Sequence, residues 1–267
     1  MKVRAIAFNA FGSFLRDRLL IVFGIIFAAV VLLMMMPLLA MKAARTASNM
    51  PQIESMAMET IAVIMSMVSG CGSLLAAWVA ANSVASEMKN GTILAVMARP
   101  INRWQFLLGK FLGVMMLMSA YVVMMFALSF LLAWMSGQRI HSTVWVLLVY
   151  PLVRYAIYAA LGIALVTLFH PVVAWGMTLI VAVLALVCSP GPPVANTTIR
   201  VLKRIGYIVL PSTSLLSESR FLTIREAALK QMSFLDHLTS LAYGADYALV
   251  LLLLAMWSFH YRTLKRD

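Results

Sequence analysis

Charged residues are scarce in this chain: Asp, Glu, Lys and Arg together make up 11% of its 267 residues. A soluble globular protein carries roughly 25% of these residues. Hydrophobic residues instead account for 63% of the chain, and the mean hydropathy is +0.96. Because one water-soluble core cannot bury that much apolar surface, lipid must solvate most of the molecule. The sequence therefore predicts an all-α polytopic membrane protein, with residues 1–267 forming a single transmembrane domain.

Acidic residues are scarcer than basic ones: the chain has 9 Asp and Glu against 21 Lys and Arg, which gives a net charge of +12. In a soluble protein this excess would suggest nucleic acid as a partner. In a membrane protein cations gather at the cytoplasmic ends of spans, so we expect no nucleic-acid partner. The apolar runs also lack the acidic residues of a proton or sodium site, which disfavours a secondary transporter.

Cysteine and histidine are rare as well. Cys71 and Cys188 both lie in apolar runs and are too few for a disulfide framework or a metal cluster. The four histidines are scattered, without the spacing of a ligand set. We therefore predict no metal site.

Apolar runs long enough to cross a bilayer need about 20 residues. The candidate spans are residues 19–41, 61–84, 105–135, 144–169, 171–190 and 245–262. Only His170 and Pro171 separate the fourth span from the fifth, and proline is a natural break between helices. The sequence predicts six spans; one long kinked helix at Pro171 is the alternative, which would leave five spans and move the C-terminus to the other side.

The N-terminal stretch 1–18 does not read as a secretory signal, because its charges continue to Arg18 and no small-residue cleavage site follows. Ile6, Ala10 and Phe14 form an apolar side, with basic residues near both ends. This pattern predicts an amphipathic helix on the membrane surface.

Basic residues set the orientation. They cluster before the first span, between the second and third spans, and after the last, whereas the short loops on the other side are poorer in them. Since cytoplasmic loops carry this excess, both chain ends are predicted to be cytoplasmic. The long loop 191–244 then lies outside, where an extracytoplasmic partner could bind. Apolar residues recur in it at helical spacing, which predicts at least one amphipathic helix at the outer surface: Ile224, Ala227, Ala228, Met232 and Leu235.

The connector 85–104 is unusually polar and rich in turn residues. Gly91 weakens a helix, Pro100 disfavours helix at Arg99, and Asn102 with Gln105 resembles a capping box at the start of the next span. One interpretation is a cationic anchor that only fixes topology. The other is a short, shaped helix that docks a cytoplasmic protein, and its candidate contact residues are Glu87, Lys89, Gly91, Thr92, Arg99, Pro100 and Arg103.

Residues 87–113 resemble the signature of type-2 ABC exporter permeases, roughly E-x-x-x-G-T-[LI]-x-x-L-L-x-x-P-[VI]-x-R-x-x-[IF]-L-L-G-K-x-x-G. Leu94 stands where an acidic residue is common, and Val96-Met97 replaces a pair of leucines. The positions that match are Glu87, Gly91, Thr92, Ile93, Pro100, Ile101, Arg103, Gly109, Lys110 and Gly113. A shorter piece, residues 210–214, is similar to an element of permeases linked to multicopper-enzyme and nitrous oxide reductase maturation.

The resemblance implies a multi-pass permease of the cell inner membrane that forms a dimer and exports a substrate. A separate dimer of ATP-binding-cassette ATPases, holding ATP and Mg, would drive it through a coupling helix within 85–104. The chain itself has no G-x-x-x-x-G-K-[ST] phosphate loop, so no ATP hydrolysis is expected on it. A membrane anchor or regulatory subunit without a transport path is the alternative function.

Arg154 lies about ten residues into the fourth span, where a charge costs about 2.5–3.5 kcal/mol on insertion scales. It could contact an anionic headgroup or substrate. Structurally, it could instead pair with Glu59 or Asp246, or reach water. Exchanging its charge with either acid and measuring folding yield would separate these interpretations.

Overall fold

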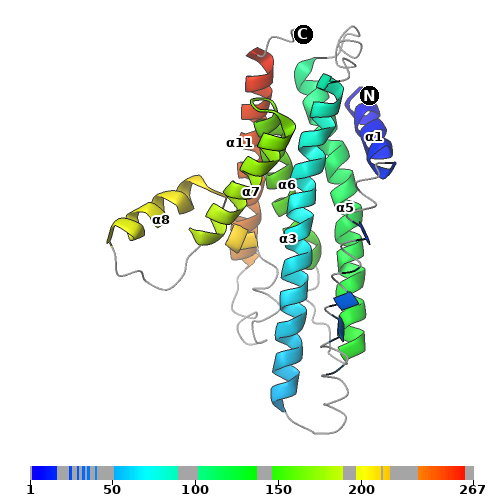
Figure 1. Cartoon of the computed structure of the whole chain (residues 1–267), viewed down its shortest axis with the longest axis vertical. Coiled ribbons are helices and arrows are strands. Elements are labelled where there is room, and N and C mark those ends of the chain that lie inside the picture. The colour runs from blue at the N-terminus through cyan, green and yellow to red at the C-terminus, as the bar shows by residue number, and fades with distance from the viewer. Residues whose placement is uncertain are drawn as a thin grey trace.

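The computed structural model describes residues 2–16, 24–25, 29, 32–33, 35–36, 40, 51–89, 102–136, 146–188, 197–211, 213–216 and 234–261 (Figure 1). Every element among them is helical, as the sequence predicts. The first predicted span, 19–41, lies largely outside these residues. The positions described within it are helical.

Two long helices dominate the molecule. Helix α3 (Pro51–Lys89) has 39 residues and α5 (Arg103–Ser136) has 34. At 1.5 Å per residue they are about 58 Å and 51 Å long, well beyond the roughly 30 Å of a hydrocarbon core. Helix α5 confirms the predicted span 105–135, whereas α3 begins ten residues before the predicted residue 61. Hydropathy misses this start because its polar residues lower the average, although Glu, Met and Ala still favour helix.

The break at Pro171 is real. Helix α6 (Val146–Val166) ends in a turn, and α7 (Pro171–Val187) begins at the proline. His170 before it is extended, with φ −65° and ψ 147°, as a residue preceding proline prefers. The alternative of a single kinked helix is therefore wrong.

Helix α11 (Phe234–Tyr261) ends near the predicted position but begins eleven residues before the predicted residue 245. Its first turn contains Asp236, and a carboxylate there is favoured by the helix dipole. One turn later, the side chains of Thr239 and Ser240 donate hydrogen bonds to the Asp236 carbonyl, so their hydroxyls are satisfied within the helix. The polar side chains of these turns lower the local hydropathy without breaking the helix.

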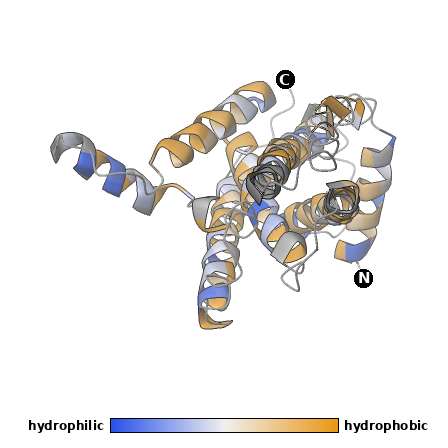
Figure 2. Cartoon of the chain, turned by 90° about the horizontal axis from the view of Figure 1, so that it is seen from below, coloured by the Kyte–Doolittle hydropathy of each residue, from blue (hydrophilic) through white to orange (hydrophobic). Residues whose placement is uncertain are grey.

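The segment between α7 and α11 contains α8 (Thr197–Val209), which is strongly amphipathic and projects sideways from the end of α7 (Figures 1 and 2). Its apolar side chains Val201, Leu202 and Ile205 are exposed. Helix α8 lies within residues 191–244, where the sequence predicts an amphipathic helix at the outer surface, and the side of the membrane on which α8 lies stays a prediction. The residues predicted for one at 224–235 lie mostly outside the described part of the chain, and Leu235 belongs to α11.

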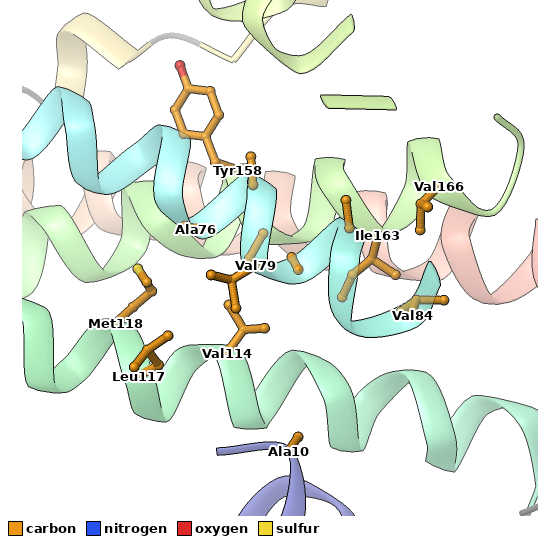
Figure 3. Packing of buried hydrophobic residues seen from close by; sticks show 14 of the residues in the cluster. Ala10, Ala76, Val79, Val84, Val114, Leu117, Met118, Tyr158, Ile163 and Val166 are labelled. Carbon is orange, nitrogen blue, oxygen red and sulfur yellow. The ribbon is translucent and has the colours of Figure 1, made fainter. Parts of the chain in front are cut away.

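Helix α6 is central: it packs against α3, α5, α7 and α11, most extensively against α3. Small residues allow that approach, since a Cβ on Gly162 would lie 2.6 Å from the carbonyl oxygen of Ala77. Apolar side chains from α3, α5 and α6 fill the core between the helices (Figure 3). Many large apolar side chains of the described helices are exposed instead, as expected where lipid is the solvent.

Four helical segments of the described chain are long and apolar enough to cross a membrane: Val63–Glu87, Arg103–Leu128, Leu148–Val166 and Phe234–Phe259. Helix α7 is apolar but has only 17 residues. A multi-pass membrane protein is therefore supported. The total of six spans stays a prediction.

Candidate coupling site and buried cations

The candidate coupling residues surround the gap between α3 and α5. Glu87 lies in the last turn of α3, Lys89 ends that helix, and Arg103 begins α5. The side chain of Lys89 and the whole of residues 90–101 lie outside the described part of the chain. The roles of Lys89, Gly91, Thr92, Arg99 and Pro100 therefore stay predictions.

The start of α5 has the predicted capping contact. The backbone N–H of Asn102 donates to Oε1 of Gln105 at 3.3 Å, which is the return half of a capping box. The Asn102 carbonyl accepts from the N–H groups of Gln105 and Phe106 at 3.0 and 3.2 Å. The first turn of α5 is thus fixed at the exit from the connector.

Glu87 forms an ion pair with Nζ of Lys110, about two turns into α5. Only 7% of the Lys110 side chain and 23% of the Glu87 side chain is exposed. The Lys110 ammonium also lies 5.9 Å from the centroid of the Phe106 ring. Burying a cation is costly unless a partner compensates for its lost hydration, and for Lys110 the Glu87 carboxylate does so. The pair therefore fastens the end of α3 to the beginning of α5.

Helix α11 also contacts the beginning of α5. A guanidinium nitrogen of Arg103 donates to the carbonyl oxygen of Phe259 at 3.2 Å, and the Phe259 and Phe106 rings stack with centroids 6.2 Å apart. We call Glu87, Arg103, Phe106, Lys110 and Phe259 the terminal cluster. It connects three helices at the end of the bundle where residues 90–101 join α3 to α5, and these residues, the middle of the predicted stretch 85–104, are called the connector below.

Helix α1 (Lys2–Leu15) packs on α5 beside this cluster (Figure 1). A Cβ on Gly109 would meet the side chain of Ile6 at 2.7 Å, and one on Gly113 would meet Cβ of Ala10 at 2.8 Å. The G-x-x-x-G pair therefore serves packing within the subunit. Ala10 and Phe14 are buried, so the protein covers much of the apolar side that the sequence assigns to the membrane surface.

Arg154 occupies the middle of α6, where it faces α3. It is 7% exposed and donates a hydrogen bond to Oγ of Ser69. Tyr155 donates to the same oxygen at 3.4 Å, and its ring meets Tyr121 edge-on at 5.9 Å. The Tyr121 hydroxyl donates to the carbonyl oxygen of Val68 at 2.8 Å. We call Ser69, Tyr121, Arg154 and Tyr155 the interior cluster.

Of the two acids proposed for Arg154, Asp246 is exposed, so it does not share the burial of Arg154. The side chain of Glu59 lies outside the described part. Ser69 was not anticipated as a partner, because the sequence argument considered only charged groups. Its signal was nevertheless present: a hydroxyl within an apolar span needs a hydrogen-bond partner.

Lys110 was identified from the sequence as a signature position and a basic residue near a span, but its pairing with Glu87 was not predicted. The signal that it pairs with Glu87 was their joint presence near facing ends of two consecutive helices. Among the described residues, no group of three or more His, Cys, Asp or Glu could hold a metal ion. The terminal cluster joins α3, α5 and α11 by an ion pair, a hydrogen bond and a ring contact, and the interior cluster places mutually hydrogen-bonded polar groups within the apolar bundle.

Comparison with known proteins gives one clear relationship. No curated protein sequence matches the chain. The family model described as "ABC-2 family transporter protein" matches residues 4–264, nearly the whole length. The chain thus belongs to the ABC-2 transporter family, as a membrane permease subunit of an ABC transporter.

Proposed function

We propose that the chain is the permease of an exporter, which moves its substrate outward across the cytoplasmic membrane. A separate dimer of ATP-binding-cassette ATPases, carrying ATP and Mg, supplies the energy. The observation that carries this proposal is the family match over residues 4–264, which covers the connector and every described helix. The substrate class stays open, and the likeness of residues 210–214 leaves membership of the maturation group a prediction.

The ATPase docks at the 90–101 connector in this proposal. The connector joins α3 to α5, and α1 and the end of α11 lie at the same end of the bundle (Figure 1). A protein that displaces the connector therefore acts directly on the ends of α3 and α5. Both chain ends then lie in the cytoplasm, in accord with the basic residues that cluster there.

A second copy of the chain completes the permease. Helices α7 and α11 expose large apolar side chains, including Ile180, Val183, Leu253 and Trp257. These surfaces suit lipid or another membrane helix equally well. A dimer of permeases gives each of the two ATPases one connector to bind.

The decisive experiment is purification of the tagged, full-length chain from native membranes, with mass spectrometry and an ATP hydrolysis assay. The expected result is an ATPase containing a phosphate-loop motif that stays bound through detergent extraction. Gly91→Pro, which stiffens the connector, and Glu87→Ala should each change ATP hydrolysis or ATPase binding. Arg204→Ala is the control, since it removes an exposed charge from α8, which projects from the side of the bundle away from the C-terminal end of α3 (Figure 1).

Two results would contradict the proposal. The first is that no ATPase co-purifies, or that Gly91→Pro and Glu87→Ala both leave ATPase binding and ATP hydrolysis unchanged. Either outcome would show that an ATPase does not act through this segment. If the ATPase binds but reconstituted vesicles show no ATP-dependent transport of any tested lipid or drug, a non-transporting regulatory subunit becomes the better description.

A further inference from the structure

The terminal cluster bears on how an ATPase stroke reaches the membrane helices. Glu87 and Lys110 flank the connector, and both match the signature at residues 87–113. In the structure the two side chains bind each other. A residue already engaged inside the permease has a different part in coupling from one that faces an ATPase.

We propose that Glu87 is a positioning residue: by pairing with Lys110 it locks the end of α3 to α5, so that displacement of the connector moves α3, α5 and α11 together. This inference rests on the proposed function, because it assigns a route for the force that the ATPase delivers. Direct contact with the ATPase is then left to residues within 90–101.

Burial is the first argument. Lys110 is 5% exposed, and it lies against the Phe106 ring rather than in water. An ATPase that drew the Glu87 carboxylate away would leave this ammonium buried without its counter-ion, which is strongly unfavourable. The pair therefore persists while the connector moves.

The second argument is that the contacts continue into α11 without a gap. Phe106, next to Lys110, stacks on Phe259, and Arg103 holds the Phe259 carbonyl. Close by, Thr167 at the end of α6 lies 3.2 Å from Oγ of Ser258. Rotation of α5 about its axis would disrupt several of these contacts together, whereas a joint movement of the helix ends preserves them.

The third argument concerns α1, which rests on Gly109 and Gly113 on either side of Lys110 in the sequence. Because the close approach leaves no room for a Cβ, α1 cannot slide along α5 without a clash. The N-terminal helix should therefore follow α5. Displacement of the connector would then move four helices: α1, α3, α5 and α11.

The test is a charge exchange in the complete complex of permease and ATPase. In reconstituted vesicles, with a lipid or drug that the wild-type complex transports as the probe, Glu87→Gln and Lys110→Gln should each lower the number of probe molecules moved per ATP hydrolysed by about tenfold, because the helix ends no longer move together. ATPase affinity should stay within about threefold of wild type. The double variant Glu87→Lys with Lys110→Glu restores an ion pair in the opposite sense and should recover most of the coupling. Lys203→Gln on α8 removes the same charge far from the cluster and should change neither quantity.

If a single variant fails to accumulate, the pair Glu87→Gln with Lys110→Met replaces it, because removal of both charges leaves no buried charge uncompensated. It should bind the ATPase normally and show the same loss of coupling. A double-mutant cycle on thermal unfolding in detergent measures the pair itself without any ATPase.

The outcomes separate the two proposals. A wild-type complex that does not form overturns the proposed function. A complex in which Glu87→Gln weakens ATPase binding tenfold or more, with no recovery on charge exchange, shows that Glu87 contacts the ATPase and overturns the positioning role. Unchanged coupling in all the Glu87 and Lys110 variants also overturns it, while leaving the proposed function intact.

Discussion

Lys110 and Arg154 are buried to nearly the same degree, 5% and 7% exposed, but the protein accommodates them differently. Lys110 lies near a helix end and is paired with a carboxylate. Arg154 lies in the middle of a span and hydrogen-bonds a neutral hydroxyl in a setting of tyrosines. Among the described contacts, an opposite charge compensates Lys110, whereas hydrogen-bonding groups surround Arg154. The two solutions predict different responses to substitution.

The largest expected effect comes from filling the space beside the interior cluster. A Cβ on Gly72 would overlap the Tyr155 hydroxyl and the Tyr121 ring, so Gly72→Leu must displace both tyrosines. We expect a loss of about 3 kcal/mol or more in the free energy of unfolding, measured by denaturation in detergent. Gly70→Leu is the matched control on the same helix, because a Cβ there has nothing within 4 Å. Equal losses in both variants would show that the tyrosine packing is not what Gly72 protects.

Next in size is Lys110→Met, which keeps the apolar stem and removes the ammonium. Glu87 then retains a largely buried charge without its partner, and we expect a loss of about 2 kcal/mol in the free energy of unfolding. Adding Glu87→Gln should recover much of that loss, since the remaining charge disappears. No recovery in the double variant would mean that Lys110 stabilises the fold through packing rather than through the ion pair.

Arg154→Met should change the free energy of unfolding by no more than about 1 kcal/mol in either direction. Removing the charge removes a cost of about 2.5–3.5 kcal/mol for placing a cation in a span, on insertion scales. Against this, the hydrogen bond from Arg154 to Ser69 and the packing of the Arg154 side chain are lost. Denaturation under the same conditions as for Lys110→Met checks the contrast. A loss greater than that of Lys110→Met would indicate an acidic partner for Arg154, with Glu59 the candidate, and a charge exchange between the two would test it.

The smallest effect is expected for Tyr155→Phe. Its hydroxyl donates over 3.4 Å to Ser69 and lies 3.6 Å from the sulfur of Met125, so both contacts are long. We therefore expect a loss of about 0.5 kcal/mol in the free energy of unfolding, measured by denaturation in detergent. Tyr150→Phe is the comparison, because that hydroxyl lies 2.8 Å from Nδ1 of buried His237 and should cost about 1 kcal/mol. The reverse order would show that the interior cluster depends on Tyr155 more than its distances suggest.

Much of the helical layout could be predicted from the sequence. The run 105–135 is continuously apolar, and Pro171 marks a break that no hydropathy average is needed to see. The starts of α3 and α11 could not be placed, because polar side chains such as Asp236 lower the local hydropathy of their first turns although the backbone is helical there. Hydropathy reports the solvent of a segment, not the extent of its helix.

The site was predicted as a set of residue types but not as a set of contacts. The signature identified Glu87 and Arg103, and the capping contact of Gln105 followed from spacing alone. That Glu87 binds Lys110, and Arg103 binds the carbonyl of Phe259, depends on how α3, α5 and α11 align, which no local pattern encodes. The same holds for Arg154, whose partner Ser69 lies on a helix far away in sequence.

Helix α3 has one further consequence as a rigid rod of 39 residues. Its length of about 58 Å means that a tilt of about 5°, pivoting at the Lys89 end, would carry Pro51 roughly 5 Å sideways. The part of α3 before Val63 extends beyond the segment suited to the bilayer, so the widest movement would occur outside it. If the proposed ATPase tilts α3 by a few degrees at its Lys89 end, the opposite end of the helix would thus move by about the width of a side chain.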